Sequence, residues 1–438
     1  MLNKQQKEAE TLISTWYKDK NSKQIFCLAG YAGTGKTYLI NHLVKNVFKL
    51  REDQVAFIAP TGKAASVITQ NSGYKAQTLH ALIYTALESE QITEVDKKKI
   101  VSKKIEFIKK AEIPNYHLII LDEVSMVDAK MMKDLLSYGA KVLCCGDSGQ
   151  LPPPISKSSH ILDNPDYTLT EIVRQAADNA IIQIATKARL GEYIPYGNYG
   201  DVIVVSPSSL DEEQMKYLLC GADQVICGTN SNRTALNDII RKYKGIDTTE
   251  HPYPLDGEKV ICTVNNWKIA LDDDDTYYLV NGTIGYCVGD YVVENKDLNI
   301  GTLSFTPDFL PGTIKHDIVS DSGIFENYEY TYDMHQHVFL TSDHRYILKE
   351  MYRPKENDET DGEFKKRIVL SIINSKKAID ESQLNRIEFS WAISCHKSQG
   401  SEWDKCVVFD ESKVFRNDRN KWLYTAITRA KKKLVIIR

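Results

Sequence analysis

The stretch "IFCLAGYAGTGKT", residues 25–37, joins a short apolar run to a glycine-rich loop. The loop fits the pattern G-x-x-x-x-G-K-[ST] through Gly30, Gly35, Lys36 and Thr37. Glycine accepts a positive φ without a Cβ penalty, so the backbone N–H groups can fold around phosphate oxygens. The apolar run predicts a buried strand, and "TYLINHLVKNVF" (37–48) predicts a helix. The unit therefore predicts a nucleoside triphosphate site, with Lys36 at the β- and γ-phosphates and Thr37 at Mg²⁺.

The rest of the chain also alternates strand-like and helical segments. A first set of apolar runs is "QVAFIAP" (54–60), "HLIILDE" (117–123) and "AKVLCCGD" (140–147). A second set is "DQVICGTN" (223–230), "EKVICTV" (258–264), "DKCVVFD" (404–410) and "KLVII" (433–437). This alternation predicts an α/β fold with parallel sheets flanked by helices. Residues 286–385 have weak helical periodicity and predict an inserted all-β module.

Two adjacent carboxylates end the strand-like run in "LIILDEVSM", residues 118–126. Asp122 is placed to hold Mg²⁺, directly or through water, and Glu123 to orient and deprotonate an attacking water. In "VLCCGDSGQLPP" (142–153), the Gln150 carboxamide can bond a γ-phosphate oxygen and that water. Arg174 and Arg429 are candidate arginine fingers for the charge that develops on the transferred phosphoryl group. Together with Lys36, these residues predict ATP hydrolysis.

Composition bounds the class of protein. The chain has 438 residues, with 42% hydrophobic and 26% charged residues, which is ordinary for a soluble globular protein. No apolar run approaches the ~18 residues of a membrane span. The nine cysteines contain no CxxC pair, so free thiols in a reducing cytoplasm are expected and zinc is not. With a net charge of −4, a nucleic-acid binder must gather its basic residues in a local groove.

Ten segments in order resemble the motifs of superfamily 1 helicases, and most closely those of the RecD/Dda-like 1B branch. They are "LNKQQKEA", "GYAGTGKT", "APTGKAA", "TLHALIY", "LDEVSM", "GDSGQLPP", "LTEIVRQ", "VNGTIG", "ISCHKSQGSEWD" and "YTAITRAK". They extend from residue 2 to residue 431, and the layout is closest to the compact Dda type of phage helicase. The resemblance implies an ATP- and Mg²⁺-dependent, monomeric DNA helicase that moves 5′→3′ on single-stranded DNA and unwinds duplexes.

The resemblance also implies site residues. At the ATP site it places Gln6 at the adenine and Glu402 near the ribose. The other ATP-binding residues that it implies are Gly30, Gly33, Thr34, Gly35, Lys36, Thr37 and Gly400. Along single-stranded DNA it places Pro60, Thr61, Thr78, His80, Asn230, Asn281, Ser394, His396 and Lys397. Ser394 stands where the family usually has Thr, which keeps the hydroxyl. Hydroxyl, imidazole and amine donors grip phosphate and sugar without reading sequence.

The implied layout has two RecA-like motor domains with two insertions. The first motor domain takes residues 1–160, with a small pin insertion at about 86–115. The second takes residues 161–285 and 386–438, and an SH3-like β-rich insertion takes residues 286–385. The lysine-rich stretch "VDKKKIVSKKIEFIKK" (95–110) fits either a solvated charged hairpin or helix, or a pin on which Phe107 stacks against the last base pair.

Several functions stay open on the sequence. A translocase that strips proteins from single strands would carry the same motifs. A P-loop kinase for a small metabolite would need an acceptor site, and a nucleotide-switched binding module would not need Glu123. The expected partners are single-stranded DNA and single-strand/duplex junctions, with single-strand-binding, replication, recombination or repair proteins. RNA in place of DNA stays open as well.

Overall fold

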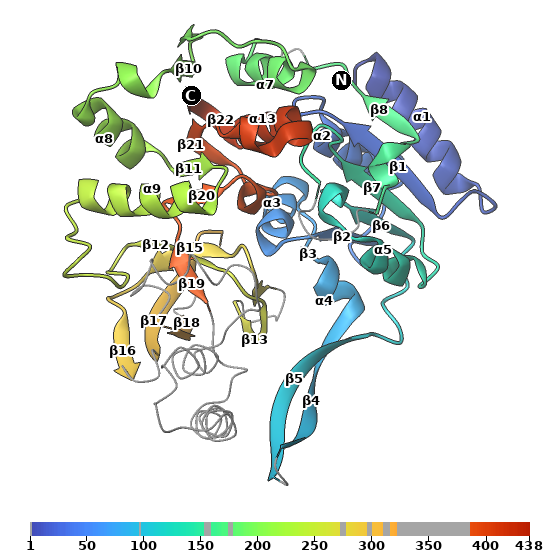
Figure 1. Ribbon diagram of the computed structural model, residues 1–438. Helices are drawn as coiled ribbons and strands as arrows, with labels where there is room; N and C mark the ends of the chain where they lie inside the picture. The colour runs from blue at the N-terminus through green and yellow to red at the C-terminus, as the bar shows by residue number, and fades with distance from the viewer. Residues whose placement is uncertain are drawn as a thin grey trace. The chain divides into compact units, whose positions relative to one another are not determined.

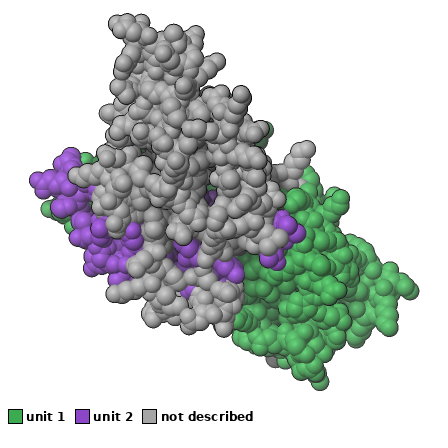
Figure 2. All heavy atoms as spheres, turned by 90° about the horizontal axis from the view of Figure 1, so that it is seen from below, with its two compact units in different colours: residues 1–84, 109–245, 391–438 green, residues 85–108, 246–390 purple. Residues whose placement is uncertain are grey.

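The computed structural model describes residues 2–95, 98–152, 159–173, 178–271, 277–295, 300–309, 316–321 and 386–438. These residues form two compact units, shown in different colours in Figure 2. Unit 1 consists of residues 1–84, 109–245 and 391–438, and unit 2 of residues 85–108 and 246–390. Both parallel sheets lie in unit 1.

The first sheet is built around the glycine-rich loop. Its order in the described chain is β3-β2-β6-β7-β1-β8, and every printed pairing is parallel. The strands are β1 (Ile25–Gly30), β2 (Val55–Ala59), β3 (Ala76–Thr78), β6 (Leu118–Leu121), β7 (Val142–Gly146) and β8 (Tyr167–Leu169). Its helices are α1 (Lys4–Lys18), α2 (Lys36–His42), α3 (Gly62–Ser72), α4 (Leu79–Ile83) and α5 (Ala129–Leu136), with short turns η1 (Leu43–Val47), η2 (Val124–Met126) and η3 (Ile161–Asp163).

The second sheet repeats the same plan. Its order is β20-β11-β21-β22-β10-β9, parallel except for β9. Its strands are β9 (Gly197–Asn198), β10 (Val202–Val205), β11 (Gln224–Cys227), β20 (Ala392–Ser394), β21 (Trp403–Phe409) and β22 (Ala430–Ile437). Its helices are α7 (Ala180–Leu190), α8 (Glu212–Gly221), α9 (Asn230–Tyr243) and α13 (Arg419–Ile427), with η4 (Pro207–Ser209), η7 (His396–Ser398) and η8 (Ser412–Asp418). In Figure 1, α13 and α7 lie side by side, and residues of the two helices are in contact.

Both parallel sheets are buried in the core of unit 1 because their strands carry apolar side chains. β2, β6, β7 and β11 are buried along their whole length, as expected of parallel strands covered on both faces. One core cluster gathers Ile58, Leu79, Leu121 and Val142, and another gathers Val225, Ile240 and Val407. The α/β fold with parallel sheets is therefore confirmed, and it is consistent with two RecA-like domains.

Unit 2 is mainly β in its described residues. One sheet has the order β16-β17-β15-β12-β19, with β18 on β17. Its strands are β12 (Lys259–Cys262), β15 (Ile284–Cys287), β16 (Val292–Asn295), β17 (Ile300–Pro307), β18 (His316–Asp321) and β19 (Ile387–Phe389). Two pairs are separate, β13 (Asn266–Ala270) with β14 (Tyr278–Leu279) and β4 (Tyr84–Val95) with β5 (Lys98–Lys109). Most of the predicted SH3-like insertion lies outside the described residues, so that prediction stands as it was made.

The pairing of strands runs past three of the predicted domain boundaries. β8 follows residue 160 yet pairs with β1 of the first sheet. β12 precedes residue 286 and β19 follows residue 385, yet they pair with each other in the sheet of unit 2. The run "EKVICTV" (258–264) thus contributes its strand to the sheet of unit 2, because an apolar run indicates burial but not the sheet in which the strand pairs.

Candidate functional site

The glycine-rich loop connects β1 to α2 in the way its glycines predict. Gly33 and Gly35 both have a φ of +78°, a left-handed conformation that favours glycine. Gly35 lies immediately before α2, so the loop presents N–H groups at a helix N-terminus. The Lys36 ammonium donates to the carbonyl of Gly30 at 2.6 Å and to that of Tyr31 at 3.2 Å. The loop therefore brings a cation and backbone donors to one place, which is the geometry of a phosphate-binding P-loop.

Three other ATP candidates lie on or near this loop. The Thr34 side chain is fully buried and donates to the carbonyl of Tyr31 at 2.8 Å. The Gln6 carboxamide donates to the carbonyl of Thr34 at 3.0 Å, and its oxygen accepts from the N–H of Asn3 at 3.0 Å. Gln6 thus both caps α1 and braces the P-loop, which places it beside the nucleotide site; its predicted adenine contact stays a prediction. Thr37 is exposed on the first turn of α2.

Asp122 and Glu123 follow β6 at the carboxyl edge of the first sheet. Glu123 has a φ of 52° and a ψ of 41°, an unusual conformation for a residue with a side chain, and its N–H donates to the Asp122 carboxylate at 2.9 Å. Burial, and then the charge of Asp122, raises the pKa of Glu123 to about 7. Burial also raises the pKa of Asp122, while Lys36 opposes this change. The two carboxyls are therefore desolvated acids held within electrostatic reach of the P-loop lysine.

Arg429, in the segment just before β22 of the second sheet, acts on Glu123. Its guanidinium is buried, donates to the carbonyls of Thr425 and Ser401 at 3.0 and 3.2 Å, and donates to the Thr428 hydroxyl at 3.0 Å. Its charge lowers the pKa of Glu123. Three of its five N–H donors are used by these bonds, so the group is fixed while two donors remain among the described residues. Arg174 lies outside the described residues.

Gln150 lies in the loop after β7 with an unusual property. Its side chain is buried, yet its Oε1 has no hydrogen-bond partner among the described residues. Buried polar atoms are nearly always paired, so an unpaired one marks a place where another group is expected to bind. The carboxamide is available for the contact with phosphate and water that its sequence position predicts.

The candidate metal ligands are Thr37 and Asp122. No cluster of three or more His, Cys, Asp or Glu side chains suited to a metal occurs in the described ranges. Mg²⁺ differs from zinc in this respect, since it commonly takes one or two protein oxygens and completes its shell with phosphate and water. A hydroxyl and a carboxylate beside a phosphate loop fit that requirement.

The DNA candidates of the first sheet stand at the ends of neighbouring strands. β2 and β3 are parallel, with Ala59 opposite Thr78, so Pro60 and Thr61 emerge beside Thr78. Thr61 and Thr78 are the N-caps of α3 and α4, and their hydroxyl oxygens accept from the N–H of Ala64 at 3.2 Å and of Ala81 at 3.1 Å. A capping hydroxyl still has its own hydrogen to donate, so both can bond a phosphate.

His80 is the second residue of α4. Burial lowers its pKa, and its ring lies 5.5 Å from that of Tyr84. At neutral pH it is therefore a neutral donor and acceptor, which suits a positioning contact better than a charge contact.

The second sheet arranges its candidates in the same way. β11 and β20 are parallel, with Cys227 opposite Ser394, so Asn230 at the start of α9 and Ser394 leave the same edge. The Ser394 hydroxyl accepts from the N–H of Lys397 at 3.4 Å. Burial lowers the pKa of His396, whose ring lies 5.7 Å from that of Phe415. Both sheets thus gather polar donors at their carboxyl edges.

The remaining candidates are placed as follows. Gly400 has a φ of +71°, and a Cβ there would lie 3.2 Å from the Thr61 hydroxyl, so the loop after η7 contacts the start of α3. Glu402 is exposed. Phe107 lies on β5 with 37% of its surface exposed, and Asn281 is exposed and donates its N–H to Asn265 at 2.8 Å. Phe107 and Asn281 belong to unit 2, and the others to unit 1.

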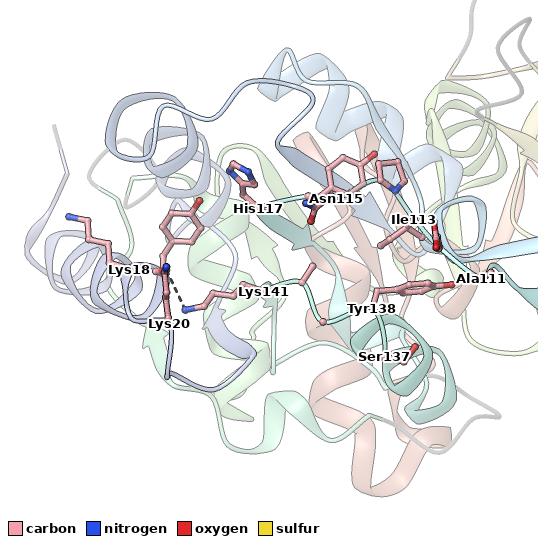
Figure 3. A pocket seen from close by; sticks show the side chains of 15 residues that line it. Lys18, Lys20, Ala111, Ile113, Asn115, His117, Ser137, Tyr138 and Lys141 are labelled. Carbon is pink, nitrogen blue, oxygen red and sulfur yellow. Dashed lines mark hydrogen bonds between the residues drawn. The ribbon is translucent and has the colours of Figure 1, made fainter.

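A cavity of about 790 Å³ lies at the opposite edge of the first sheet (Figure 3). It is lined by residues that precede β6 and β7, such as His117 and Lys141, together with Lys18 and Lys20 from the end of α1. The parallel strands point away from this edge and toward the P-loop. The Lys141 ammonium donates to the carbonyls of Trp16 at 2.5 Å and Asp19 at 2.6 Å, so it closes the end of α1. This cavity is therefore separate from the nucleotide site.

Sequence reasoning missed four buried residues that connect these motifs, namely Asp147, Gln399, Tyr424 and Thr425. Tyr424 donates its hydroxyl to Asp147 at 2.6 Å and accepts from the P-loop N–H of Ala32 at 2.8 Å. Thr425 and Gln399 bond the backbone of Leu151. All four stand inside the quoted motif strings, yet their partners are hundreds of residues away in sequence, so no local pattern could pair them.

Comparison with protein families and with known proteins shows which proteins this chain resembles. The family "AAA domain" matches residues 1–201, and the family "UvrD-like helicase C-terminal domain" matches residues 389–437. The chain is 26% identical to the ATP-dependent DNA helicase PIF1 of Candida albicans, over 92% of this chain and 51% of that protein. It is 27% identical to the ATP-dependent DNA helicase dda of Enterobacteria phage T4, over 69% of this chain and 74% of that protein. The chain thus spans about half the length of the Candida relative.

Two further similarities are of the same kind. The ATP-dependent RecD2 DNA helicase of Deinococcus radiodurans is 33% identical over 40% of this chain and 23% of that protein. Among solved structures, the crystal structure of the Pif1 helicase from Candida albicans aligns with 100% of this chain and 94% of that one, at 18% identity and a TM-score of 0.47. Within the described residues, no helix is both long and apolar enough to cross a membrane.

Proposed function

Since the chain belongs to the superfamily 1B group of Pif1-, RecD- and Dda-like DNA helicases, we propose that it hydrolyses ATP to move 5′→3′ along single-stranded DNA and to unwind duplexes. One observation carries the proposal most. The Tyr424 hydroxyl of α13 accepts from the P-loop N–H of Ala32 at 2.8 Å, and the buried guanidinium of Arg429, just before β22, lies within electrostatic reach of Glu123 at the end of β6. The Glu123 carboxylate, proposed as the catalytic base, thus interacts electrostatically with two cations. Lys36 comes from the first sheet and Arg429 from the segment that leads into the second.

The residues then take the following roles in hydrolysis. Lys36 and the loop N–H groups would bind the β- and γ-phosphates, and Thr37 and Asp122 would hold Mg²⁺, which would supply positive charge to neutralise the phosphates. Glu123 accepts the proton of the attacking water, and Gln150 orients that water against the γ-phosphate. The remaining donors of Arg429 stabilise the charge that develops on the transferred group. Arg174 is the second proposed finger.

The strand is proposed to lie across the carboxyl edges of both sheets. Thr61, Thr78 and His80 would hold the 3′ part of the strand, and Asn230, Ser394 and Lys397 the 5′ part, with Pro60, Asn281 and His396 beside them. ATP binding would draw the two sheets together and hydrolysis would release them, which gives net 5′→3′ movement. Because backbone contacts dominate, binding should tolerate any sequence and weaken with salt.

The decisive experiment compares tailed duplexes. ATP hydrolysis is measured with and without single-stranded DNA, and strand displacement is then measured on duplexes with only a 5′ tail or only a 3′ tail. We expect stimulation by the strand and unwinding of the 5′-tailed substrate. Preferential unwinding of the 3′-tailed substrate would refute the polarity. Stimulation without any unwinding would favour the translocase, and hydrolysis indifferent to DNA would favour a small-molecule kinase.

The β4–β5 pair is proposed as the duplex-separating pin. Phe107 and Ile108 are adjacent on β5, with 37% and 48% of their surfaces exposed, and successive side chains of a strand face opposite sides. Phe107→Ala should reduce unwinding much more than strand-stimulated hydrolysis, because movement on a single strand needs no base-pair separation. Ile108→Ala is the matched control. Equal loss of both activities in Phe107→Ala would refute the pin.

Partners and setting complete the proposal. The chain would act as a monomer at single-strand/duplex junctions in the cytoplasm, during replication, recombination or repair, alongside single-strand-binding proteins.

A further inference from the structure

Residues 147–151, which we name the sensor segment, are held by three buried hydrogen bonds from the C-terminal part of the chain. The Tyr424 hydroxyl donates to the Asp147 carboxylate at 2.6 Å. The Leu151 N–H donates to the Thr425 hydroxyl at 2.9 Å, and the Gln399 carboxamide donates to the Leu151 carbonyl at 2.7 Å. Asp147, Leu151, Gln399, Tyr424 and Thr425 are each at most 4% exposed. Both ends of the segment are therefore fixed from outside the first sheet.

Gln150 lies inside this segment but takes no part in these bonds. Its N–H donates to the carbonyl of Asp147 at 3.2 Å, and the Gly149 N–H donates to the Asp147 carboxylate at 2.8 Å, so the segment is one tight turn. The Gln150 Oε1 is buried without a partner among the described residues. The position of this oxygen is thus set by the anchors of the turn, and a shift of an anchor would move it.

Gln399 connects that turn to the strand-contact loop. The Gln399 N–H donates to the carbonyl of His396 at 3.3 Å, and the Ser398 hydroxyl donates to the carbonyl of Cys395 at 2.7 Å. The loop from Ser394 to Gln399 is therefore a compact turn that contains Lys397. One face of this turn carries the candidate strand contacts, and its end bonds the segment that carries Gln150.

We propose that Gln399 is a positioning residue that couples strand binding to the γ-phosphate site, through its hydrogen bond to the Leu151 carbonyl. This inference rests on the proposed function, since it names how the strand reaches the hydrolytic site. When DNA seats on Ser394–Lys397, Gln399 holds the sensor segment so that Gln150 meets the water and the γ-phosphate. Because Gln399 is only 4% exposed, it would act through the Leu151 carbonyl rather than by contact with DNA or ATP.

A merely structural role would give a different outcome. A buried carbonyl that loses its donor destabilises the fold wherever it lies. Coupling between two sites is a separate quantity, because each ligand then changes the affinity of the other by the same factor. The test must therefore measure that factor beside stability.

The experiment uses Gln399→Met, which keeps the length of the side chain and removes the donor. The matched control is Gln224→Met, since Gln224 is also fully buried and its carboxamide donates to the Trp391 carbonyl at 3.0 Å, away from the sensor segment. For each protein, the affinity for a fluorescent oligodeoxythymidine is measured with and without a non-hydrolysable ATP analogue. Hydrolysis is measured with and without the same strand.

In Gln399→Met we expect the analogue to lose most of its effect on strand affinity, and strand stimulation of hydrolysis to fall about tenfold. Affinity for the strand without nucleotide should stay near the wild-type value, and Gln224→Met should keep wild-type coupling. Coupling that survives in Gln399→Met, or that is lost equally in both variants, would overturn the inference. If Gln399→Met does not fold, Thr425→Val removes the hydroxyl that accepts from the Leu151 N–H, so it releases the same residue of the sensor segment and tests the coupling with the same two measurements.

Failure of this inference is distinguishable from failure of the proposed function. A wild-type chain whose hydrolysis ignores the strand refutes the function. A wild-type chain that responds to the strand, together with a Gln399→Met variant that responds equally, refutes the coupling alone.

Discussion

The dipeptide Asp-Glu occurs at equivalent places in the two parallel sheets and does different things there. Asp122 and Glu123 follow β6, and Asp410 and Glu411 follow β21. β6 lies between β2 and β7, and β21 lies between β11 and β22, so each dipeptide leaves the carboxyl end of a central strand. Taken along the chain, the first five parallel strands of each sheet are arranged in the same order, 3-2-4-5-1.

The surroundings separate the two glutamates. The Glu411 carboxylate accepts from the N–H groups of Gly228 at 2.5 Å and Thr229 at 3.1 Å, from the Thr229 hydroxyl at 2.8 Å and from the Asn232 amide at 2.8 Å. By contrast, no donor within the described residues bonds the Glu123 carboxylate, whose pKa is raised to about 7. A saturated carboxylate holds a loop together, whereas a desolvated and unsaturated one is ready to accept a proton. The chemistry thus comes from the neighbours, since the residue pair is the same.

The largest expected effect tests whether the second sheet completes the first. Arg429→Ala should lower strand-stimulated hydrolysis by about 10³ or more, because the transition-state charge loses a fixed cation. Affinity for a fluorescent ATP analogue should change much less. The side chain is buried with three hydrogen bonds, so thermal unfolding must be followed as well, and Arg429→Lys serves as a charge-retaining variant. Normal turnover in Arg429→Ala would show that the site is built from the first sheet alone.

The next effect concerns the reactive glutamate. Glu123→Gln should reduce hydrolysis by about 10² or more, because the amide cannot accept the proton of the attacking water. ATP and DNA binding should persist. Stability should not fall, since the change removes a desolvated acid that faces the charge of Asp122. Single-turnover hydrolysis and thermal unfolding measure the two outcomes, and near-normal turnover would mean that another group is the base.

Much of this site was predictable from the sequence, because its parts are local. The strand–loop–helix unit around Lys36 and the carboxylates at the end of a strand follow from residue type and spacing. The left-handed φ of Glu123 could not be predicted in this way, since glycine and asparagine are the residues that usually indicate such a conformation. The anchoring of Asp147 by Tyr424 also could not, because the two lie 277 residues apart and meet only through packing of both sheets. The pairing of β12 with β19 was not predictable either, because an apolar run does not indicate its partner strand.

The smallest expected effect tests the saturated glutamate. Glu411→Gln replaces one carboxylate oxygen by an amide that donates, where backbone and side-chain donors already converge. Hydrogen bonds to a charged group are worth more than neutral ones, so we expect the free energy of unfolding to fall by about 1 to 2 kcal/mol. Hydrolysis without DNA should stay within a few-fold of wild type, whereas strand affinity should fall modestly, because Asn230 begins the helix whose N-cap, Thr229, is held by Glu411. Chemical denaturation, with the exposed Glu192→Gln as control, measures the first quantity. A loss of hydrolysis as large as that of Glu123→Gln would break the comparison, since it would show that the second Asp-Glu pair also takes part in the chemistry.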